Sequence, residues 1–154
     1  IAVYSGLIEK LKLTDDELAA VMGHEIAHAL REHSREAMSQ VVAQQMGIAV
    51  LGAALNMGSV TQDLLDKAAT VAIQLPNSRE KETEADRIGL ELTARAGYDP
   101  RGAVSVWKKM MAANSSHPPE FLSTHPNPES RMQDIENYPP RVLPLYETAK
   151  KKPR

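Results

Sequence analysis

Residues 24–28 read HEIAH, and this short stretch constrains the fold more than any other part of the chain. Positions four apart in an α-helix lie about 40° apart around its axis, so His24 and His28 share a face only if the segment is helical. Neutral imidazoles are ligands that Zn²⁺ prefers, and Glu25, about 100° further round, could reach a water on the metal without binding the metal itself. The motif therefore predicts a helix that carries two metal ligands and a general base.

A plain alternative remains, in which the two histidines and a solvated glutamate simply lie on a helix surface. A catalytic zinc of this kind has three protein ligands and one position for water. The chain has no cysteine, so the third ligand must be His, Asp or Glu. His33 is nearest, but it lies about 180° round the helix from His24 and cannot share its face unless the helix breaks. We therefore interpret His33 as a structural residue near the helix end.

The segment NSREKETEADRIG, some fifty residues further on, offers a better third ligand. Glu82 and Asp86 are four apart on a predicted helix and so share a face. Glu80 and Glu84 point roughly the opposite way. Glu82 would bind the metal, and Asp86 would accept the free ring N–H of a ligand histidine and so fix its tautomer. The alternative for this segment is an acidic, solvated helix face.

The remaining sequence predicts one helix-rich domain, because apolar residues recur at helical spacing over most of its 154 residues. Thr14 with Glu17 forms a capping box, and the segment LPNS is expected to interrupt the helical pattern. AVY near the N-terminus has strand character. The expected fold is mainly α, with a long active-site helix, several packed helices and a short, N-terminally truncated β element. Helices are predicted at residues 15–33, 34–56, 61–75, 77–96, 100–114 and 128–137.

Residues 41–57, VVAQQMGIAVLGAALNM, form the least polar stretch. Seventeen residues that include two glutamines are too short and too polar for a membrane span. We expect a buried helix here, with a membrane-touching or partner-binding helix as the alternative. Trp107 and its helical neighbours likewise predict a packed core face rather than a binding stripe.

The net charge of the chain and the composition of its last residues lead to two further predictions. A net charge of −2 gives no electrostatic reason to expect a nucleic acid partner. Residues 139–154 are rich in proline and end in basic residues, so we expect a solvated or loosely docked tail. The predicted organisation is a domain over residues 1–138 followed by this tail.

HEIAHALREHS and SREKETEAD together resemble the HtpX-like and CAAX prenyl protease-like zinc metalloendopeptidases, a branch of the gluzincins. IAVYSGLI, AGYDPRGAVSVWKKM and STHPNPESRM are similar to the same family, so the likeness extends to about residue 135. The resemblance implies a zincin-like α+β fold, a polypeptide substrate and one Zn²⁺ per chain. It implies His24, His28 and Glu82 as the zinc ligands. It also implies Glu25 as the general base and Asp86 as the residue that orients a ligand histidine, most plausibly His24.

The resemblance also gives roles to residues in THPNPESR. It implies that His125 and Arg131 lie over the zinc on the substrate side, where either could stabilise an oxyanion. In some family members the histidine instead closes onto the zinc and blocks the water. Taken alone, the sequence favours a plain loop histidine at 125, and His117 is interpreted as a surface residue.

Three functional hypotheses follow. The first is a zinc metalloendopeptidase for protein quality control in the bacterial cell envelope, periplasmic or membrane-associated, with envelope proteins as partners. The second is a latent or chaperone-like scaffold in which His125 caps the metal, and the third is a plain helical binding domain with an accidental motif. Family members have a further strand before the segment matching IAVYSGLI. Without that strand, we expect weaker pairing with substrate and self-association through an exposed N-terminal strand.

Overall fold

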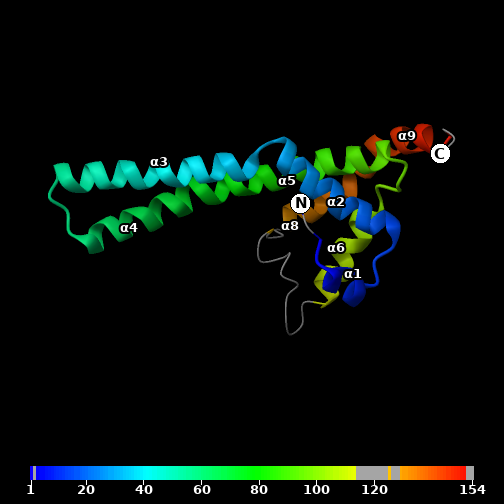
Figure 1. Cartoon of the computed structure of the whole chain (residues 1–154), viewed down its shortest axis with the longest axis horizontal. Helices are drawn as coiled ribbons and strands as arrows, with labels where there is room; N and C mark the ends of the chain where they lie inside the picture. The colour runs from blue at the N-terminus through cyan, green and yellow to red at the C-terminus, as the bar shows by residue number, and fades with distance from the viewer. Residues whose placement is uncertain (2, 114–124, 126–128, 152–154) are drawn as a thin grey trace. The chain divides into compact units, whose positions relative to one another are not determined.

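The computed structural model describes residue 1 and residues 3–113, 125 and 129–151 (Figure 1). Nearly all of these residues are helical and none belongs to a strand, so the expectation of a mainly α chain is confirmed. The chain forms two compact units: the first unit, residues 1–27 with 83–154, and the second unit, residues 28–82. The elements are α1 (Ser5–Leu11), α2 (Asp15–Leu30), α3 (His33–Ala54), α4 (Ser59–Ala69), the π-helix η1 (Thr70–Gln74), α5 (Leu75–Arg95), α6 (Gly102–Ala112), α8 (Glu129–Asn137) and α9 (Pro139–Lys150).

The short β element expected at the N-terminus is not found among the described residues. Tyr4 has the extended backbone of a strand residue, φ −75° and ψ 129°, but it serves as the N-cap of α1. A strand requires a neighbouring strand to satisfy its backbone hydrogen bonds, and no described residue supplies one. The expected self-association through an N-terminal strand therefore has no basis in the described part of the chain.

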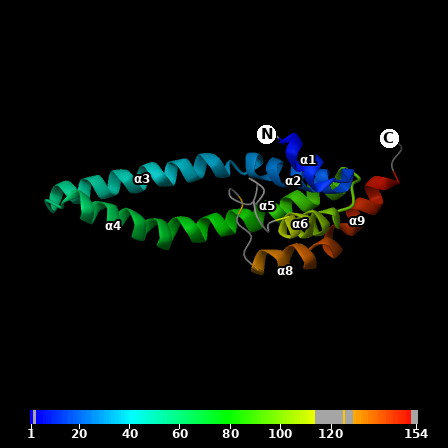
Figure 2. The same ribbon diagram turned by 90° about the horizontal axis from the view of Figure 1, so that it is seen from below.

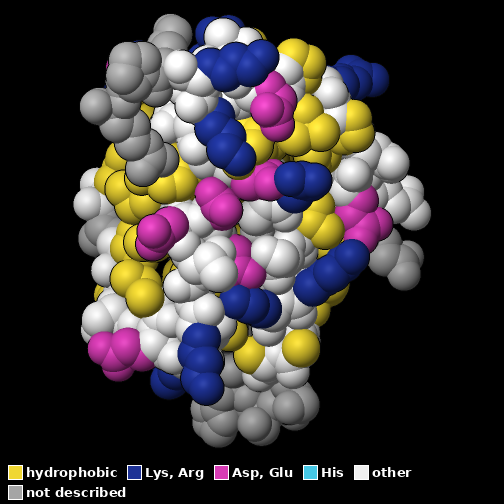
Figure 3. Space-filling view, turned by 90° about the vertical axis from the view of Figure 1, so that its right-hand side faces the viewer, with side chains coloured by type: hydrophobic (Ala, Val, Ile, Leu, Met, Phe, Trp, Pro, Cys, Tyr) yellow, Lys and Arg dark blue, Asp and Glu magenta, His cyan; other side chains and the backbone are white. Residues whose placement is uncertain are grey.

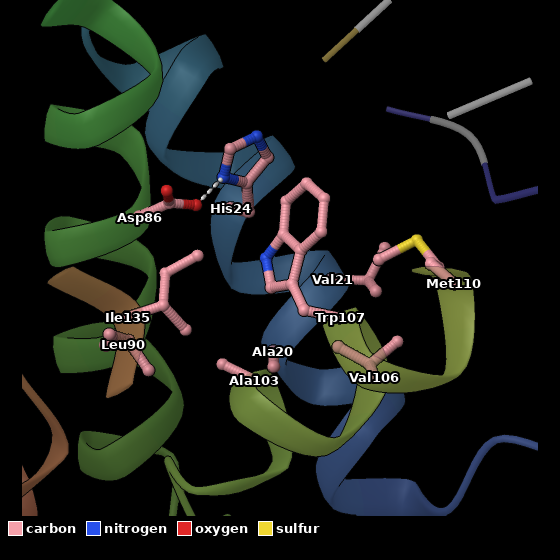
Figure 4. A pocket seen from close by; sticks show the side chains of 10 residues that line it. All are labelled: Ala20, Val21, His24, Asp86, Leu90, Ala103, Val106, Trp107, Met110 and Ile135. Atoms are coloured by element: carbon pink, nitrogen blue, oxygen red, sulfur yellow. Dashed lines mark ion pairs between the residues drawn. The ribbon is translucent and has the colours of Figure 1, made fainter. Parts of the chain in front are cut away.

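The core of the first unit gathers around the apolar face of α6. Trp107 and Met110 are 4% and 1% exposed, which confirms the prediction that this helix presents a packed face rather than a binding stripe. Figure 4 shows Trp107 among side chains from α2, α5 and α8. The other buried members of this core are Leu11, Ala20, Val21, Leu90, Ala94, Ala103, Val106, Ile135 and Val142.

Two glycines set the distance between α2 and α5 within the first unit. A Cβ atom added at Gly89 would lie 2.7 Å from the backbone nitrogen of His24, and one added at Gly23 would lie 2.6 Å from the carbonyl oxygen of Gly89. Only a hydrogen fits at either position, so the two backbones can approach this closely only with glycine. This crossing brings residues of α5 next to His24.

The C-terminal segment predicted as a loose tail is instead the packed helix α9. Val142 is 3% exposed and belongs to the core, and Pro139 is also buried. Proline is tolerated in the first turn of a helix, where its missing N–H would have no partner, so Pro139 starts α9 rather than preventing it. The apolar positions 142, 145 and 146 then follow helical spacing on the side that packs.

The second unit contains a helical hairpin in which α3 and α4 run side by side (Figures 1 and 2). The predicted break at LPNS is wrong, because η1 leads directly into α5 at Leu75 without an intervening loop. Pro76 is the second residue of α5, a position in the first turn that proline can occupy. The prediction of a buried helix at residues 41–57 is also wrong: only 6% of the most apolar window of α3 is buried.

Candidate metal centre

The start of α2 is anchored by the predicted capping box. The backbone N–H of Thr14 donates to Glu17 Oε2 at 2.8 Å, and that of Glu17 donates to Thr14 Oγ1 at 3.3 Å. Lys109 Nζ and Ser105 Oγ on α6 also donate to the Glu17 carboxylate, at 2.6 and 2.7 Å. Burial alone would raise the pKa of Glu17, but these hydrogen bonds and the Lys109 charge outweigh it and lower that pKa. Hydrogen bonds to Glu17 thus join α6 to the start of the helix that carries HEIAH.

His24 is buried and its Nδ1 atom faces a carboxylate. Nδ1 lies 2.9 Å from Asp86 Oδ1 on α5, the pair marked by a dashed line in Figure 4. Asp86 stands one turn before Gly89, so the close glycine crossing places it against the ring. At this distance the carboxylate could accept a proton from Nδ1, and the role of Asp86 toward a ligand histidine stays a prediction.

Asp86 also accepts hydrogen bonds from Arg131 on α8. Its Nε donates to Asp86 Oδ2 at 2.5 Å and its Nη2 to Oδ1 at 3.0 Å, and the guanidinium lies 4.7 Å from the centre of the Trp107 ring. Burial acts to raise the pKa of Asp86, but the hydrogen bonds and charge of Arg131, together with His24, lower it. The Arg131 side chain is only 1% exposed, so its guanidinium neutralises Asp86 rather than facing an open substrate side.

His125 lies between His24 and Glu25. Its Nδ1 is 3.3 Å from His24 Nε2, with the two rings edge to face, and its Nε2 is 3.3 Å from Glu25 Oε1. Both nitrogens of this one histidine are thus engaged by the residues that the motif marks as a metal ligand and a base. His117 lies outside the described residues.

In the second unit, His28 has a matching pair of neighbours. Its Nε2 lies 3.3 Å from Glu82 Oε1, and its Nδ1 lies 3.0 Å from Nδ1 of His33. His33 is 5% exposed, and its contact with His28 is one that the sequence did not reveal. The helix breaks after Leu30, where Glu32 adopts a left-handed backbone with φ 53°, and this turn brings His33 back to His28. The only sequence signal is the charged group REH, which interrupts the apolar spacing of α2.

The two histidines of the motif make the same pattern of contacts. Each has Nδ1 held by a buried neighbour, Asp86 or His33, and Nε2 directed at another side chain that could bind a metal. Among the described residues, side chains able to bind a metal ion are His24 and His125 in the first unit, and His28 and Glu82 in the second. A histidine oriented at Nδ1 with its Nε2 lone pair available is the usual donor for zinc, so these residues fit that ion.

The surface drawn in Figure 3 has no extended region that is only positively or only negatively charged. Lys and Arg side chains are interspersed there with Asp and Glu, and hydrophobic groups lie between them. A polyanion requires a basic stripe, and this face does not present one.

Comparison of the sequence with known proteins finds peptidases. The model of peptidase family M48 matches residues 1–138. The chain is 38% identical over 131 residues to the mitochondrial metalloendopeptidase OMA1 of Arabidopsis thaliana, covering 85% of this chain and 26% of that protein. It is 35% identical over 152 residues to OMA1 of Schizosaccharomyces pombe, covering 97% of this chain and 44% of that protein.

A bacterial relative is similar to the same degree. The chain is 35% identical over 143 residues to the β-barrel assembly-enhancing protease of Escherichia coli, covering 85% of this chain and 29% of that protein. The chain therefore spans less than half the length of these relatives. No solved structure gave a match.

Proposed function

The chain belongs to peptidase family M48, and from this premise we propose that it is the catalytic part of a zinc-dependent metalloendopeptidase. The observation that carries the proposal is the pattern of contacts that the two motif histidines share. His24 and His28 each have Nδ1 held by a buried neighbour and Nε2 directed at another candidate ligand. Surface histidines on a helix would have no reason to be oriented at one nitrogen in this repeated way.

We propose His24, His28 and Glu82 as the protein ligands of one zinc ion. His24 and His28 share a face of the continuous helix α2, and Glu82 shares a face of α5 with Asp86. The contact between His28 Nε2 and Glu82 Oε1 at 3.3 Å supports this set, because a shared metal would lie between two such donors.

Glu25 is the proposed general base. When bound, zinc would acidify a water molecule and polarise the scissile carbonyl. Glu25 would accept the proton from the attacking water and deliver it to the leaving amine. Its side chain is 25% exposed and its carboxylate lies 3.3 Å from His125 Nε2, so Glu25 is accessible to water and held in place at the same time.

Asp86, Arg131 and His33 are proposed to prepare the ligands. Arg131 helps to keep Asp86 ionised, and the ionised carboxylate accepts the Nδ1 proton of His24. The lone pair of His24 is then confined to Nε2, where a metal can use it. His33 does the same for His28, provided that His28 Nδ1 carries the proton and His33 Nδ1 accepts it.

A latent, zinc-holding protein is the second candidate, and the position of His125 is the observation that favours it. His125 lies against both His24 Nε2 and Glu25, where it would compete with a substrate or with water. In an active enzyme this histidine would move away, or stabilise the oxyanion during the reaction. Replacing it separates the two roles: His125→Ala should raise turnover if the histidine blocks the site and lower it if the histidine assists.

The proposed setting is protein quality control in the bacterial cell envelope, with polypeptide substrates. The support is the relative from Escherichia coli, whose name describes a protease that enhances β-barrel assembly. The OMA1 relatives are mitochondrial, so the family is not confined to one compartment. Fractionation of the source cells, with detection of the chain by antibody, tests this setting independently of activity.

Casein digestion together with elemental analysis tests the proposed enzyme. The wild-type chain should contain about one zinc and lose digestion when a chelator removes it. Glu25→Gln should retain the metal and lose activity by about 100-fold or more. Glu82→Ala should lose most of the zinc, whereas Glu80→Gln, an exposed change on the same helix, should behave as wild type. Full activity in Glu25→Gln, or full zinc in Glu82→Ala, would contradict the respective assignment.

A further inference from the structure

The helix that runs from α4 into α5 contains a π-helical turn, η1, at Thr70–Gln74. A π-turn has hydrogen bonds from i to i+5, so it holds one residue more than the α-helical turn that it replaces. Such turns are rare, and a strained backbone persists only where its surroundings hold it. All five residues of η1 are described and none of them is buried, so packing in a core does not account for this turn.

Gln44 on α3 binds residues before and at the end of this π-turn. Its Nε2 donates to Asp66 Oδ1 at 2.8 Å and more weakly to Thr70 Oγ1 at 3.5 Å, and its Oε1 accepts from Gln74 Nε2 at 2.9 Å. Thr70 Oγ1 in turn donates to the carbonyl of Asp66 at 2.9 Å. These four residues all lie in the second unit. Both polar atoms of one side-chain amide are thus engaged by the helix that contains η1.

The π-turn brings Gln74 to the side of its helix on which Asp66 lies. In a regular α-helix, Thr70 and Gln74 would lie about 40° and 80° round from Asp66. Because a π-turn takes more than four residues, the step from Thr70 to Gln74 no longer passes a full turn, and the drift is reversed. One amide can therefore contact Asp66 and Gln74 at once. The hydrogen bonds of Gln44 favour the π form over the α form.

The same turn determines which way Glu82 points. Glu82 is eight residues beyond Gln74, and its Oε1 lies 3.3 Å from His28 Nε2. Next to it, Lys81 Nζ lies 3.5 Å from Glu36 Oε1 on α3. If η1 became α-helical while α4 stayed paired with α3, every later residue would rotate by about 100° and shift by about 1.5 Å. Glu82 would then turn away from His28.

We propose that Gln44 is a positioning residue of the metal centre, because it holds η1 in the π form and so keeps Glu82 directed at His28. The inference rests on the proposed function, in which Glu82 and His28 are zinc ligands. Gln44 acts at a distance, since it is eleven residues beyond the start of α3 at His33, about 16 Å along that helix. Its effect reaches the metal centre through the rotation of the partner helix.

Zinc affinity of the whole chain, measured by competition with a chelator, tests the proposal. Gln44→Ala should weaken zinc binding about tenfold or more, because it removes the hydrogen bonds that favour the π form. Gln45→Ala is the matched control, since it changes the same residue type at the next, exposed position, and it should bind zinc as wild type does.

Glu82→Ala, measured beside these variants, separates this inference from the proposed function. Weak binding in Glu82→Ala with wild-type affinity in Gln44→Ala would overturn the positioning role alone. Wild-type affinity in Glu82→Ala would overturn the proposed ligand set, and the positioning role with it.

Deleting one residue of η1 distinguishes positioning from a general loss of stability. A π-turn differs from an α-turn by one extra residue, so deletion of the exposed Ala72 gives a continuous α-helix with Glu82 in its native place. Adding this deletion to Gln44→Ala should restore zinc affinity to within about threefold of wild type. If Gln44 only stabilised the fold, the deletion would bring no recovery, and that result would overturn the proposal.

A distance between two spin labels reads the same rotation without metal. Because the chain has no cysteine, Ser39→Cys on α3 and Glu80→Cys on α5, both exposed, can carry the labels. A rotation of about 100° moves a group at the helix surface by about 8 Å. The distance distribution should therefore change in Gln44→Ala and return to that of wild type when Ala72 is also deleted. An unchanged distribution in Gln44→Ala, with circular dichroism showing that the variant is folded, would overturn the proposal.

Discussion

The two units of this chain distribute polar and apolar side chains in opposite ways. In the first unit, Trp107 and Met110 are buried, and the charged groups within it, Asp86 and Arg131, neutralise each other. In the second unit, Gln44 and Asp66 bond on the inside of the hairpin while large apolar side chains face outward. A core of the first kind stabilises a fold in water by burial, whereas the hairpin buries little apolar surface and gains little stability in this way. Substitutions should therefore be costly in the first unit and mild in the hairpin.

The largest effect is expected from Arg131→Leu. The change leaves the Asp86 carboxylate buried without its charged partner, which should cost about 3–5 kcal/mol of unfolding free energy. Denaturant or thermal unfolding, compared with wild type, measures this loss. Arg131→Lys should recover part of it, because a single ammonium group replaces one of the two donated bonds. A loss below about 1 kcal/mol would show that the pair does not stabilise the first unit.

Gly89→Ala should be destabilising by about 1–3 kcal/mol, since the new Cβ would meet the backbone of His24 at 2.7 Å. The backbone movement needed to accommodate this Cβ should also displace His24 from Asp86 and weaken zinc retention in a chelator competition.

Gly47→Ala in α3 is the matched change for the hairpin. No atom lies within 4 Å of the added Cβ, so the variant should be neutral or up to about 1 kcal/mol more stable. Equal destabilisation by the two glycine substitutions would remove the contrast between the units.

Glu17→Gln should destabilise the chain by about 1–2 kcal/mol at pH 7, since it removes charge-assisted bonds to Lys109. The pKa of Glu17 is lowered on folding, so its carboxylate contributes stability above its unfolded pKa. That contribution is lost as the pH falls through the lower, folded value. Unfolding measured from pH 7 down to pH 3 should therefore show wild type and variant converging, and a constant difference would contradict the assignment.

The smallest effect is expected from Leu55→Ser at the hairpin tip. Leu55 is 67% exposed, so in water this change should alter the free energy of unfolding by no more than about 0.5 kcal/mol. Thermal unfolding is the measurement. A loss comparable with that of Arg131→Leu would mean that the tip is packed in water after all.

Much of the local structure could be predicted from sequence. The capping box of Thr14 and Glu17 and the helix over residues 129–137 depend on contacts between near neighbours, which spacing reveals. The membership in a metalloendopeptidase family, inferred from HEIAH with ETEAD, is confirmed by comparison. The metal ligands and the base stay predictions, although the contacts of His24 and His28 support them.

The wrong predictions share one cause. The N-terminal AVY, the expected break at LPNS and the expected tail after residue 138 were all interpreted from local composition. Whether AVY pairs as a strand, or whether residues 139–150 pack as α9, depends on what other segments lie alongside. Composition also identified residues 41–57 as apolar but could not tell whether protein or solvent surrounds them.

The sequence by itself therefore determined which helix carries His24, Glu25 and His28, because a helix places residues four apart on one face whatever surrounds it. Only the tertiary structure decided what holds those residues. The glycine crossing brings Asp86 to His24, Arg131 neutralises Asp86 from α8, and the left-handed turn at Glu32 returns His33 to His28. These contacts join residues whose distance in space does not follow from their spacing along the chain.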